Sequence, residues 1–267
     1  MNEKQLNEES RTMWNKKAEF WDNLHGDEGN AFHRVLVSPS VERLLQLHTG
    51  EHVLDIGCGS GVLARRLSEL GGRVTAVDFS EGLIQRAQAR GTKGAYPIDY
   101  RVVDATDEQA LRALGEGQFD AITCTMALMD MPVIAPLYRA VRALLKPGGR
   151  FVFATMHPAF NSNHPVFMME SGDDNGEIYT RLAIKISAYL DIPPVKGAGA
   201  IGEPSPHYYY HRPLHALLSP AFEAGLVLDA IEEPAFPEQQ GEPLRLSWKS
   251  YPQIPPVLTA RLTVKEA

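Results

Sequence analysis

The sequence has little cysteine, no cluster of basic residues and no long apolar run. Its two cysteines, Cys58 and Cys124, are far apart and form no C-x-x-C pair, so they predict neither a disulfide framework nor a metal site. A net charge of −7 without a lysine- or arginine-rich run argues against the positive surface that nucleic acid binding requires. Free thiols, an acidic start and the lack of about 20 consecutive apolar residues predict a cytoplasmic protein without a membrane partner.

Two common catalytic motifs are also missing. No G-K-[ST] follows the glycine-rich part of the chain, which excludes a P-loop, and no G-x-S-x-G elbow indicates a hydrolase. At 267 residues the chain is long enough for one large domain with an embedded cap.

A glycine-rich turn follows the first predicted strand. Gly57-Cys58-Gly59-Ser60-Gly61 comes directly after the strand predicted over residues 51–56 and before a helix predicted over residues 62–70. The unpaired N–H groups at the start of that helix predict a seat for a carboxylate or a phosphate. The third glycine arrives one residue earlier than in the G-x-G-x-x-G fingerprint of dinucleotide-binding proteins, which argues against an NAD-dependent oxidoreductase.

Strands and helices alternate along the first half of the chain, which predicts a parallel sheet with right-handed crossovers. The second and third predicted strands each end near an acid, Asp78 and Asp104, and the string Leu144–Gly149 ends a helix before the fifth strand. A ligand of such a sheet lies at the carboxyl ends of its strands. The second to fifth strands are predicted over residues 73–78, 100–105, 119–124 and 150–154.

The glycine spacing, the acid two residues before it and the order of these strands resemble the class I S-adenosylmethionine-dependent methyltransferases, over roughly residues 40–157. The resemblance implies an α/β, Rossmann-like fold with a seven-stranded, mostly parallel sheet, helices on both faces and an antiparallel last strand. Residues 226–230 and 256–264 fit its sixth and seventh strands. It also implies S-adenosylmethionine as cofactor, S-adenosylhomocysteine as product, and in-line methyl transfer to an O, N or C nucleophile of a small molecule.

The resemblance assigns cofactor contacts to individual residues. Asp78 would hold the ribose hydroxyls, Asp104 would accept a hydrogen bond from the adenine amine, and the N–H of Ala105 would meet a ring nitrogen. Cys124 would offer its backbone carbonyl to the amino group of the cofactor. Asp78 as a helix N-terminal acid and Asp104 as a solvated turn acid are the ordinary alternatives. The predicted cofactor-binding set is Asp55, Gly57, Cys58, Gly59, Asp78, Phe79, Asp104, Ala105 and Cys124.

The residues after the fourth predicted strand disfavour two other substrate classes. Methyltransferases that act on exocyclic base amines or on glutamine carry Asn/Asp-Pro-Pro-aromatic there, whereas this chain has Thr125-Met126-Ala127-Leu128. Cys124 also lacks the preceding proline of the enzymes that methylate cytosine at C5. The resemblance is therefore to the branch that acts on small molecules.

Four segments are predicted along the chain. Residues 1–40 form an N-terminal helical lid, with a helix over residues 12–23, and residues 41–157 form the cofactor-binding core. Residues 158–212 form a long irregular insertion that caps the substrate, and residues 213–267 add a helix and a β-hairpin that complete the sheet. A helix simply packed on the core and a satellite core are the alternatives for the lid and the cap. Aromatic residues predicted to contact substrate or form the lid are Trp14, Trp21, Tyr209 and Tyr210.

Histidines are the acid–base candidates. His157 follows the fifth strand and His211 precedes the last predicted helix, and a neutral imidazole there would accept a proton from the attacking group. Packing or capping roles are the alternative, and an already ionised substrate needs no base. A protein that binds the cofactor without methyl transfer is the alternative function. No metal is expected, because no carboxylate pattern accompanies the histidines at 157, 164, 207, 211 and 215.

Overall fold

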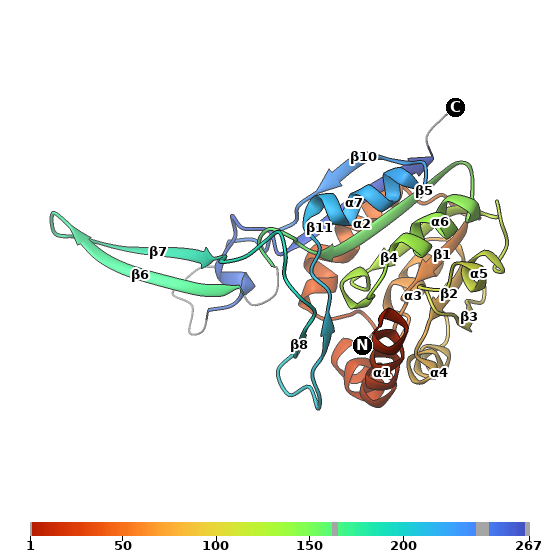
Figure 1. The fold of residues 1–267 in the computed structure, drawn as a ribbon, viewed down its shortest axis with the longest axis horizontal. Helices are drawn as coiled ribbons and strands as arrows, with labels where there is room; N and C mark the ends of the chain where they lie inside the picture. The colour runs from red at the N-terminus through yellow and green to blue at the C-terminus, as the bar shows by residue number, and fades with distance from the viewer. Residues whose placement is uncertain (1, 162–164, 239–245, 265–267) are drawn as a thin grey trace.

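The fold is described from a computed structural model for residues 2–161, 165–238 and 246–264. A seven-stranded sheet in the order β10-β11-β5-β4-β1-β2-β3 forms its centre (Figure 1). The strands are β1 (His52–Ile56), β2 (Arg73–Asp78), β3 (Asp99–Val102), β4 (Phe119–Thr125), β5 (Leu145–Met156), β10 (Leu226–Glu232) and β11 (Val257–Val264).

The last strand, β11, runs antiparallel between β5 and β10, as the sequence predicts. Val257 pairs with Met156 on one side and Val264 pairs with Leu226 on the other. All pairs among β1, β2, β3, β4 and β5 are parallel. The predicted fold class is confirmed, and the carboxyl ends of the parallel strands meet at one edge of the sheet.

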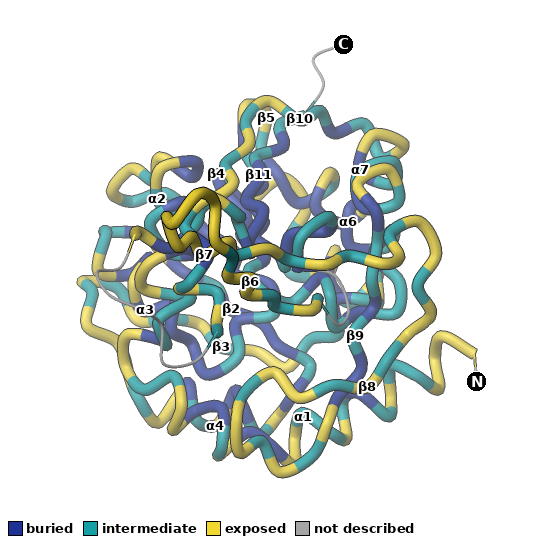
Figure 2. Tube along the Cα trace, turned by 90° about the vertical axis from the view of Figure 1, so that its left-hand side faces the viewer, coloured by how far each residue is buried: buried dark blue, intermediate teal, exposed yellow. Residues whose placement is uncertain are grey.

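Two apolar cores cover the two faces of the sheet because its strands are apolar on both sides. One core joins the sheet to α5 (Glu108–Arg112), α6 (Ala135–Leu144) and α7 (Leu214–Glu223). The other joins it to the π-helix His33–Val37, α2 (Ser38–Leu45), α3 (Val62–Glu69) and α4 (Glu81–Arg90). Figure 2 shows buried backbone concentrated in these central elements.

The N-terminal helix α1 (Glu3–His25) is longer than predicted and starts at a capping box, in which Asn2 and Gln5 each accept from the other's backbone N–H. It packs beside α4, and Asp22 of α1 accepts a hydrogen bond from Arg90 Nε at 2.5 Å. None of the helices described is long and apolar enough to cross a membrane.

The prediction of irregular structure is wrong for much of residues 158–212. Instead, β6 (Val166–Asp174) and β7 (Glu177–Lys185) form a long hairpin that projects from the body (Figure 1), here called the arm. Asn175 and Gly176 have φ of 55° and 88°, the left-handed values that a two-residue hairpin turn requires. A second ribbon, β8 (Val195–Gly197) with β9 (His207–Tyr209), lies against α1.

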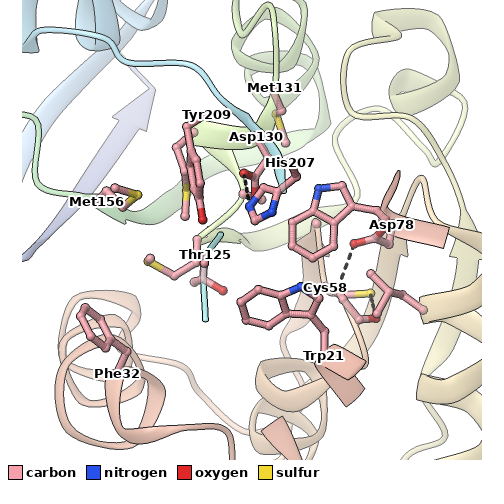
Figure 3. Close-up of a pocket in the computed structure, with 18 of the residues that line it drawn as sticks. Trp21, Phe32, Cys58, Asp78, Thr125, Asp130, Met131, Met156, His207 and Tyr209 are labelled. Atoms are coloured by element: carbon pink, nitrogen blue, oxygen red, sulfur yellow. Dashed lines mark hydrogen bonds and ion pairs between the residues drawn. The ribbon is translucent and has the colours of Figure 1, made fainter. Parts of the chain in front are cut away.

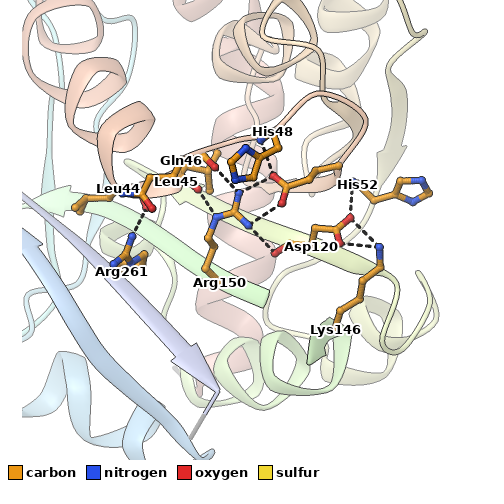
Figure 4. A network of polar contacts seen from close by, with 10 residues as sticks. Leu44, Leu45, Gln46, His48, His52, Asp120, Lys146, Arg150 and Arg261 are labelled. Carbon is orange, nitrogen blue, oxygen red and sulfur yellow. Dashed lines mark hydrogen bonds and ion pairs between the residues drawn. The ribbon is translucent and has the colours of Figure 1, made fainter. Parts of the chain in front are cut away.

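A polar network fixes the opposite, amino-terminal edge of the parallel strands (Figure 4). Arg150 of β5 donates to both carboxylate oxygens of Glu51, at 3.0 and 2.6 Å, and to the carbonyl of Leu45. Lys146 pairs with Asp120 at 2.7 Å. These contacts tie the start of β1, β4 and β5 to the end of α2, and they leave the other edge for the site.

Candidate functional site

A cavity of about 530 Å³ lies at the carboxyl ends of β1, β2, β3 and β4. One side is formed by residues that follow these strands, at positions 57–60, 103–106 and 125–127. The other side is formed by α1 and by the ribbon of β8 and β9. Figure 3 shows Trp21, His207 and Tyr209 from this second side facing Asp78 and Cys58.

The three glycines of the turn after β1 serve different purposes. All have positive φ, at 70°, 55° and 81° for Gly57, Gly59 and Gly61. A Cβ on Gly57 would lie 2.6 Å from the Cβ of Ala127, and one on Gly61 would lie 2.5 Å from Tyr100 Oη. A Cβ on Gly59 would meet no described atom within 4 Å. The protein itself therefore requires glycine at 57 and 61, while the bare backbone of Gly59 leaves room for a ligand in the cavity.

Two buried carboxyl groups lie beside this turn. Asp78 accepts from the N–H groups of Gly59 at 2.9 Å and Ser80 at 2.8 Å, and burial raises its pKa to about 6. Asp55 accepts from Thr123 Oγ1 at 2.9 Å, and burial raises its pKa to about 7. Its other oxygen is buried and has no hydrogen-bond partner among the described residues. An unpaired buried acceptor fits a donor supplied by a ligand, above all a cationic one.

Asp104 connects the site to α1. Its Oδ2 accepts from Asn7 Nδ2 at 2.6 Å, and its Oδ1 accepts from the N–H and hydroxyl of Thr106 at 2.8 and 2.7 Å. Asn7 and Thr106 also line the cavity and were not predicted from the sequence. The helix α1 is therefore held at Asp104, the carboxylate for which the sequence predicts an adenine contact.

Most of the predicted cofactor-binding residues line the cavity. Cys124 does not, because β4 runs one residue further than predicted and places Thr125 and Met126 at the cavity, while Cys124 is buried in the apolar core. Asp55 lies directly beneath the turn rather than on the cavity wall. The residues that do line it are Gly57, Cys58, Gly59, Asp78, Phe79, Asp104 and Ala105.

The predicted catalytic histidines are not brought to the cavity. His157 follows the last residue of β5, Met156, which takes the cavity side, and its ring bonds Glu233 Oε1 at 2.8 Å and the N–H of Ala159 at 3.1 Å. His211 bonds the carbonyl of Tyr189 at 2.5 Å and lines a separate small cavity. The pairing of these rings with the protein leaves them as structural residues.

Side-chain alternation along β9 divides the aromatic segment. His207 and Tyr209 face the main cavity, whereas Tyr208 and Tyr210 point the other way, as successive residues of a strand do. The prediction for Tyr210 is therefore wrong in position, since it lines the small neighbouring cavity. Trp14, Trp21 and Tyr209 lie where the sequence predicts.

Glu203 is the centre of a buried polar cluster that sequence reasoning missed. Its Oε1 accepts from Lys17 Nζ at 2.7 Å, Trp21 Nε1 at 3.0 Å and His207 Nδ1 at 3.0 Å. Although burial opposes it, the hydrogen bonds from His207, Lys17 and the N–H of Gly199 lower the pKa of Glu203 to about 2. Glu203 is therefore a carboxylate that joins α1 to the ribbon above the cavity.

Asp130 and a second pair of histidines were also missed. Asp130 ends the short 3-10 helix Leu128–Asp130 and faces His207 across the cavity wall (Figure 3). His25 and His33 line the cavity with ring centroids 4.6 Å apart, and burial lowers their pKa values to about 3 and about 4. The described residues contain no cluster of three or more potential metal ligands, and His164 lies outside them.

Comparisons with known proteins show similarity to methyltransferases. Residues 54–153 match the family model of a methyltransferase domain. A ubiquinone biosynthesis O-methyltransferase of Xanthomonas oryzae pv. oryzae (strain PXO99A) is 39% identical over 108 residues, which are 40% of this chain and 44% of that protein. This chain thus spans less than half of that relative's length.

Solved structures agree over most of the chain. An S-adenosylmethionine-dependent methyltransferase from Mesorhizobium loti has 26% identity and a TM-score of 0.62 over 84% of this chain and 95% of its own. A putative one from Listeria monocytogenes has 21% identity and a TM-score of 0.65 over 86% and 96%. Residues 54–153 therefore match a methyltransferase domain, and the chain shares its fold with S-adenosylmethionine-dependent methyltransferases. S-adenosylmethionine is the cofactor of those enzymes.

Proposed function

We propose that this protein transfers a methyl group from S-adenosylmethionine to an oxygen nucleophile of a small, largely apolar molecule. The observation that carries the proposal is the glycine turn after β1, here called the cradle. Of its three glycines only Gly59 faces open space, and the unpaired oxygen of Asp55 lies beneath the turn. The Xanthomonas oryzae relative is named as an O-methyltransferase, which supports oxygen as the nucleophile.

One half of the cavity fits the cofactor. Asp78, at the end of β2, would hold the ribose, and Asp104 with the N–H of Ala105 would hold the adenine. The turn at Gly57 and Gly59 would hold the amino-acid end, and the negative charge of Asp55 beneath the turn would favour its ammonium group. When bound, S-adenosylmethionine supplies a methyl group activated by the positive charge on its sulfur.

The other half is apolar and suits a substrate with a flat hydrocarbon body. Aromatic and thioether side chains from α1, β5, β6 and β9 line it. Phe167 of β6 stacks on Tyr251 at 5.2 Å and meets Trp248 edge-on, so the base of the arm supports this wall. The labelled members in Figure 3 are Trp21, Phe32, Met131, Met156 and Tyr209.

The protein contributes alignment and exclusion of water. The cofactor half and the apolar half share one cavity, so a substrate oxygen held in one would be aimed at the methyl carbon held in the other. Alignment of this kind accounts for about 7–11 kcal/mol of a barrier in well-oriented reactions. The helix α1 and the ribbon of β8 and β9 cover the cavity, in the roles of lid and cap.

Two measurements test the proposal. Calorimetry with S-adenosylmethionine, S-adenosylhomocysteine and NADH in parallel should show binding of the first two, and binding of NADH alone would contradict it. A metabolite extract incubated with deuterated-methyl cofactor should then yield a labelled methyl ether by mass spectrometry. Asp78→Ala should abolish both signals, while the matched Asp229→Ala, at a surface pair with Arg261, should change neither. Tight cofactor binding without any labelled product would favour the binding-protein alternative.

A further inference from the structure

Three ionisable groups stand in a row at the apolar half of the cavity. Glu203 Oε1 lies 3.0 Å from His207 Nδ1, and His207 Nε2 lies 3.7 Å from Asp130 Oδ1. The His207 ring is fixed between Trp14, with ring centroids 4.8 Å apart, and Tyr209, with centroids 4.5 Å apart. The row therefore has one hydrogen-bonded contact, at 3.0 Å, and one wider contact, at 3.7 Å; Figure 3 shows Asp130 beside His207.

The hydrogen-bonded contact sets the tautomer of His207. Glu203 is ionised and can only accept hydrogen bonds, so the proton of a neutral imidazole must sit on Nδ1. Nε2 is left with a free lone pair directed toward Asp130. Burial and the charge of Lys17 lower the pKa of His207, and Glu203 raises it, with a net lowering that keeps the ring neutral at neutral pH.

No hydrogen bond spans the gap between His207 and Asp130. At 3.7 Å, Nε2 and Asp130 Oδ1 are too far apart for a hydrogen bond. Asp130 Oδ1 is buried and receives no hydrogen bond from any residue that the structure describes. Burial raises the pKa of Asp130, as expected of a carboxyl group without a donor. The raised pKa favours the protonated acid, whose O–H can donate to the oxygen of a substrate hydroxyl while that hydroxyl donates its own proton to Nε2.

We propose, building on the methyl transfer proposed above, that His207 is its general base and that Asp130 positions a neutral hydroxyl group of the substrate against it. The hydroxyl proton passes to His207 Nε2, and its bonding electrons stay on the oxygen. That oxygen forms the new bond to the methyl carbon as the carbon–sulfur bond breaks, with the electron pair left on the sulfur of S-adenosylhomocysteine. The imidazolium then returns its proton to solvent.

The charges around the site select against an anionic substrate. No lysine or arginine among the described residues lines the cavity, and the nearby cation Lys17 is already paired with Glu203. A carboxylate or phosphate would therefore be buried there without a cation, at a cost that a phenol or alcohol does not have. Among the other cavity histidines, His33 bonds Asn30 Oδ1 at 3.0 Å, and the Nε2 of His25 meets no described partner, so neither has the carboxylate that orients His207.

The tautomer of His207 is measurable without turnover. Protein labelled with ¹⁵N in histidine and saturated with S-adenosylhomocysteine should show His207, assigned by its loss in His207→Gln, as the neutral Nδ1–H form at pH 7.5. Its protonation midpoint should lie below the ordinary value of about 6.5. An Nε2–H tautomer, or an imidazolium at pH 7.5, would overturn the assignment even in a protein that transfers methyl groups.

Kinetics on the labelled product then separate the roles. His207→Gln should lower kcat about 10²–10⁴-fold and remove the acidic limb of its pH profile. Asp130→Asn should raise KM about tenfold or more. The matched His211→Gln, outside the cavity, should stay within about twofold of wild type. Full activity of His207→Gln would contradict the role of His207 as general base but not the proposed methyl transfer. The absence of any labelled product from wild type would contradict the proposed function itself.

Discussion

Lys17 Nζ on α1 lies 2.7 Å from Glu203 Oε1 in the loop between β8 and β9, and neither side chain is exposed to solvent. The two residues belong to segments far apart in the sequence that cover the cavity from the same side. The pair therefore joins α1 to the loop between β8 and β9.

We expect Lys17→Met to destabilise the protein by about 3–5 kcal/mol, because it leaves a buried carboxylate without its cation. Urea unfolding would measure the loss, and hydrogen exchange should show faster opening of α1. Arg11→Met is the control, since Arg11 and Glu8 form an ion pair on the exposed side of the same helix. An unchanged unfolding midpoint for Lys17→Met would show that this ion pair does not hold α1 against the loop between β8 and β9.

The glycine turn allows a matched comparison. Gly59→Ala and Gly57→Ala both place a side chain at positive φ, which costs about 1–2 kcal/mol in each. Only Gly57→Ala also collides with Ala127. We expect Gly59→Ala to fold and to bind S-adenosylmethionine at least about tenfold more weakly, and Gly57→Ala to lose more stability. Calorimetry and thermal unfolding on the same samples would test this, and wild-type affinity of Gly59→Ala would contradict the cradle.

The sheet and the cofactor half of the site were predictable because their signals are local. Strand alternation, the glycine turn and the acid of β2 lie next to one another in the sequence, and the parallel sheet brings strand ends together at one edge. The Asn175-Gly176 turn of the arm is an equally local signal, and it was overlooked.

The substrate half was not predictable in the same way. Glu203, His207 and Asp130 meet because β9 packs against the 3-10 helix Leu128–Asp130, and nothing in their spacing in the sequence indicates that contact. Alternation along β9 implies that His207 and Tyr209 share a face, but not which face meets the cavity.

Asp55 predicts a pH dependence of the ligand-free protein. Its pKa rises from 3.8 to about 7 on folding, so the folded state binds its proton more tightly than the unfolded state. The stability due to this group is complete below about pH 4 and is lost as the pH rises through 7. Asp55→Asn removes the dependence, because the amide is neutral at every pH. We expect the variant to gain stability relative to wild type between pH 5 and pH 8.

The gain should be on the order of 1–4 kcal/mol, since each pKa unit corresponds to about 1.4 kcal/mol. Thermal unfolding at pH 5 and at pH 8 would measure it. The same variant should bind S-adenosylmethionine more weakly, having lost the partner of its ammonium group. Identical pH profiles for the two proteins would mean that Asp55 is ionised in the fold.

The arm tests how far the site extends. Only its base meets the cavity, through Pro165 and Phe167, while residues further out, such as Met169 and Ile178, are exposed. Replacing residues 169–182 with Asn-Gly would keep the register between Phe167 and Ile184. We expect calorimetry to show cofactor affinity within about twofold of wild type, because cofactor and arm occupy opposite ends of the cavity. A tenfold loss of cofactor affinity would place the outer arm within the binding site. Phe167→Ala, which removes part of the cavity wall, should instead weaken substrate binding alone.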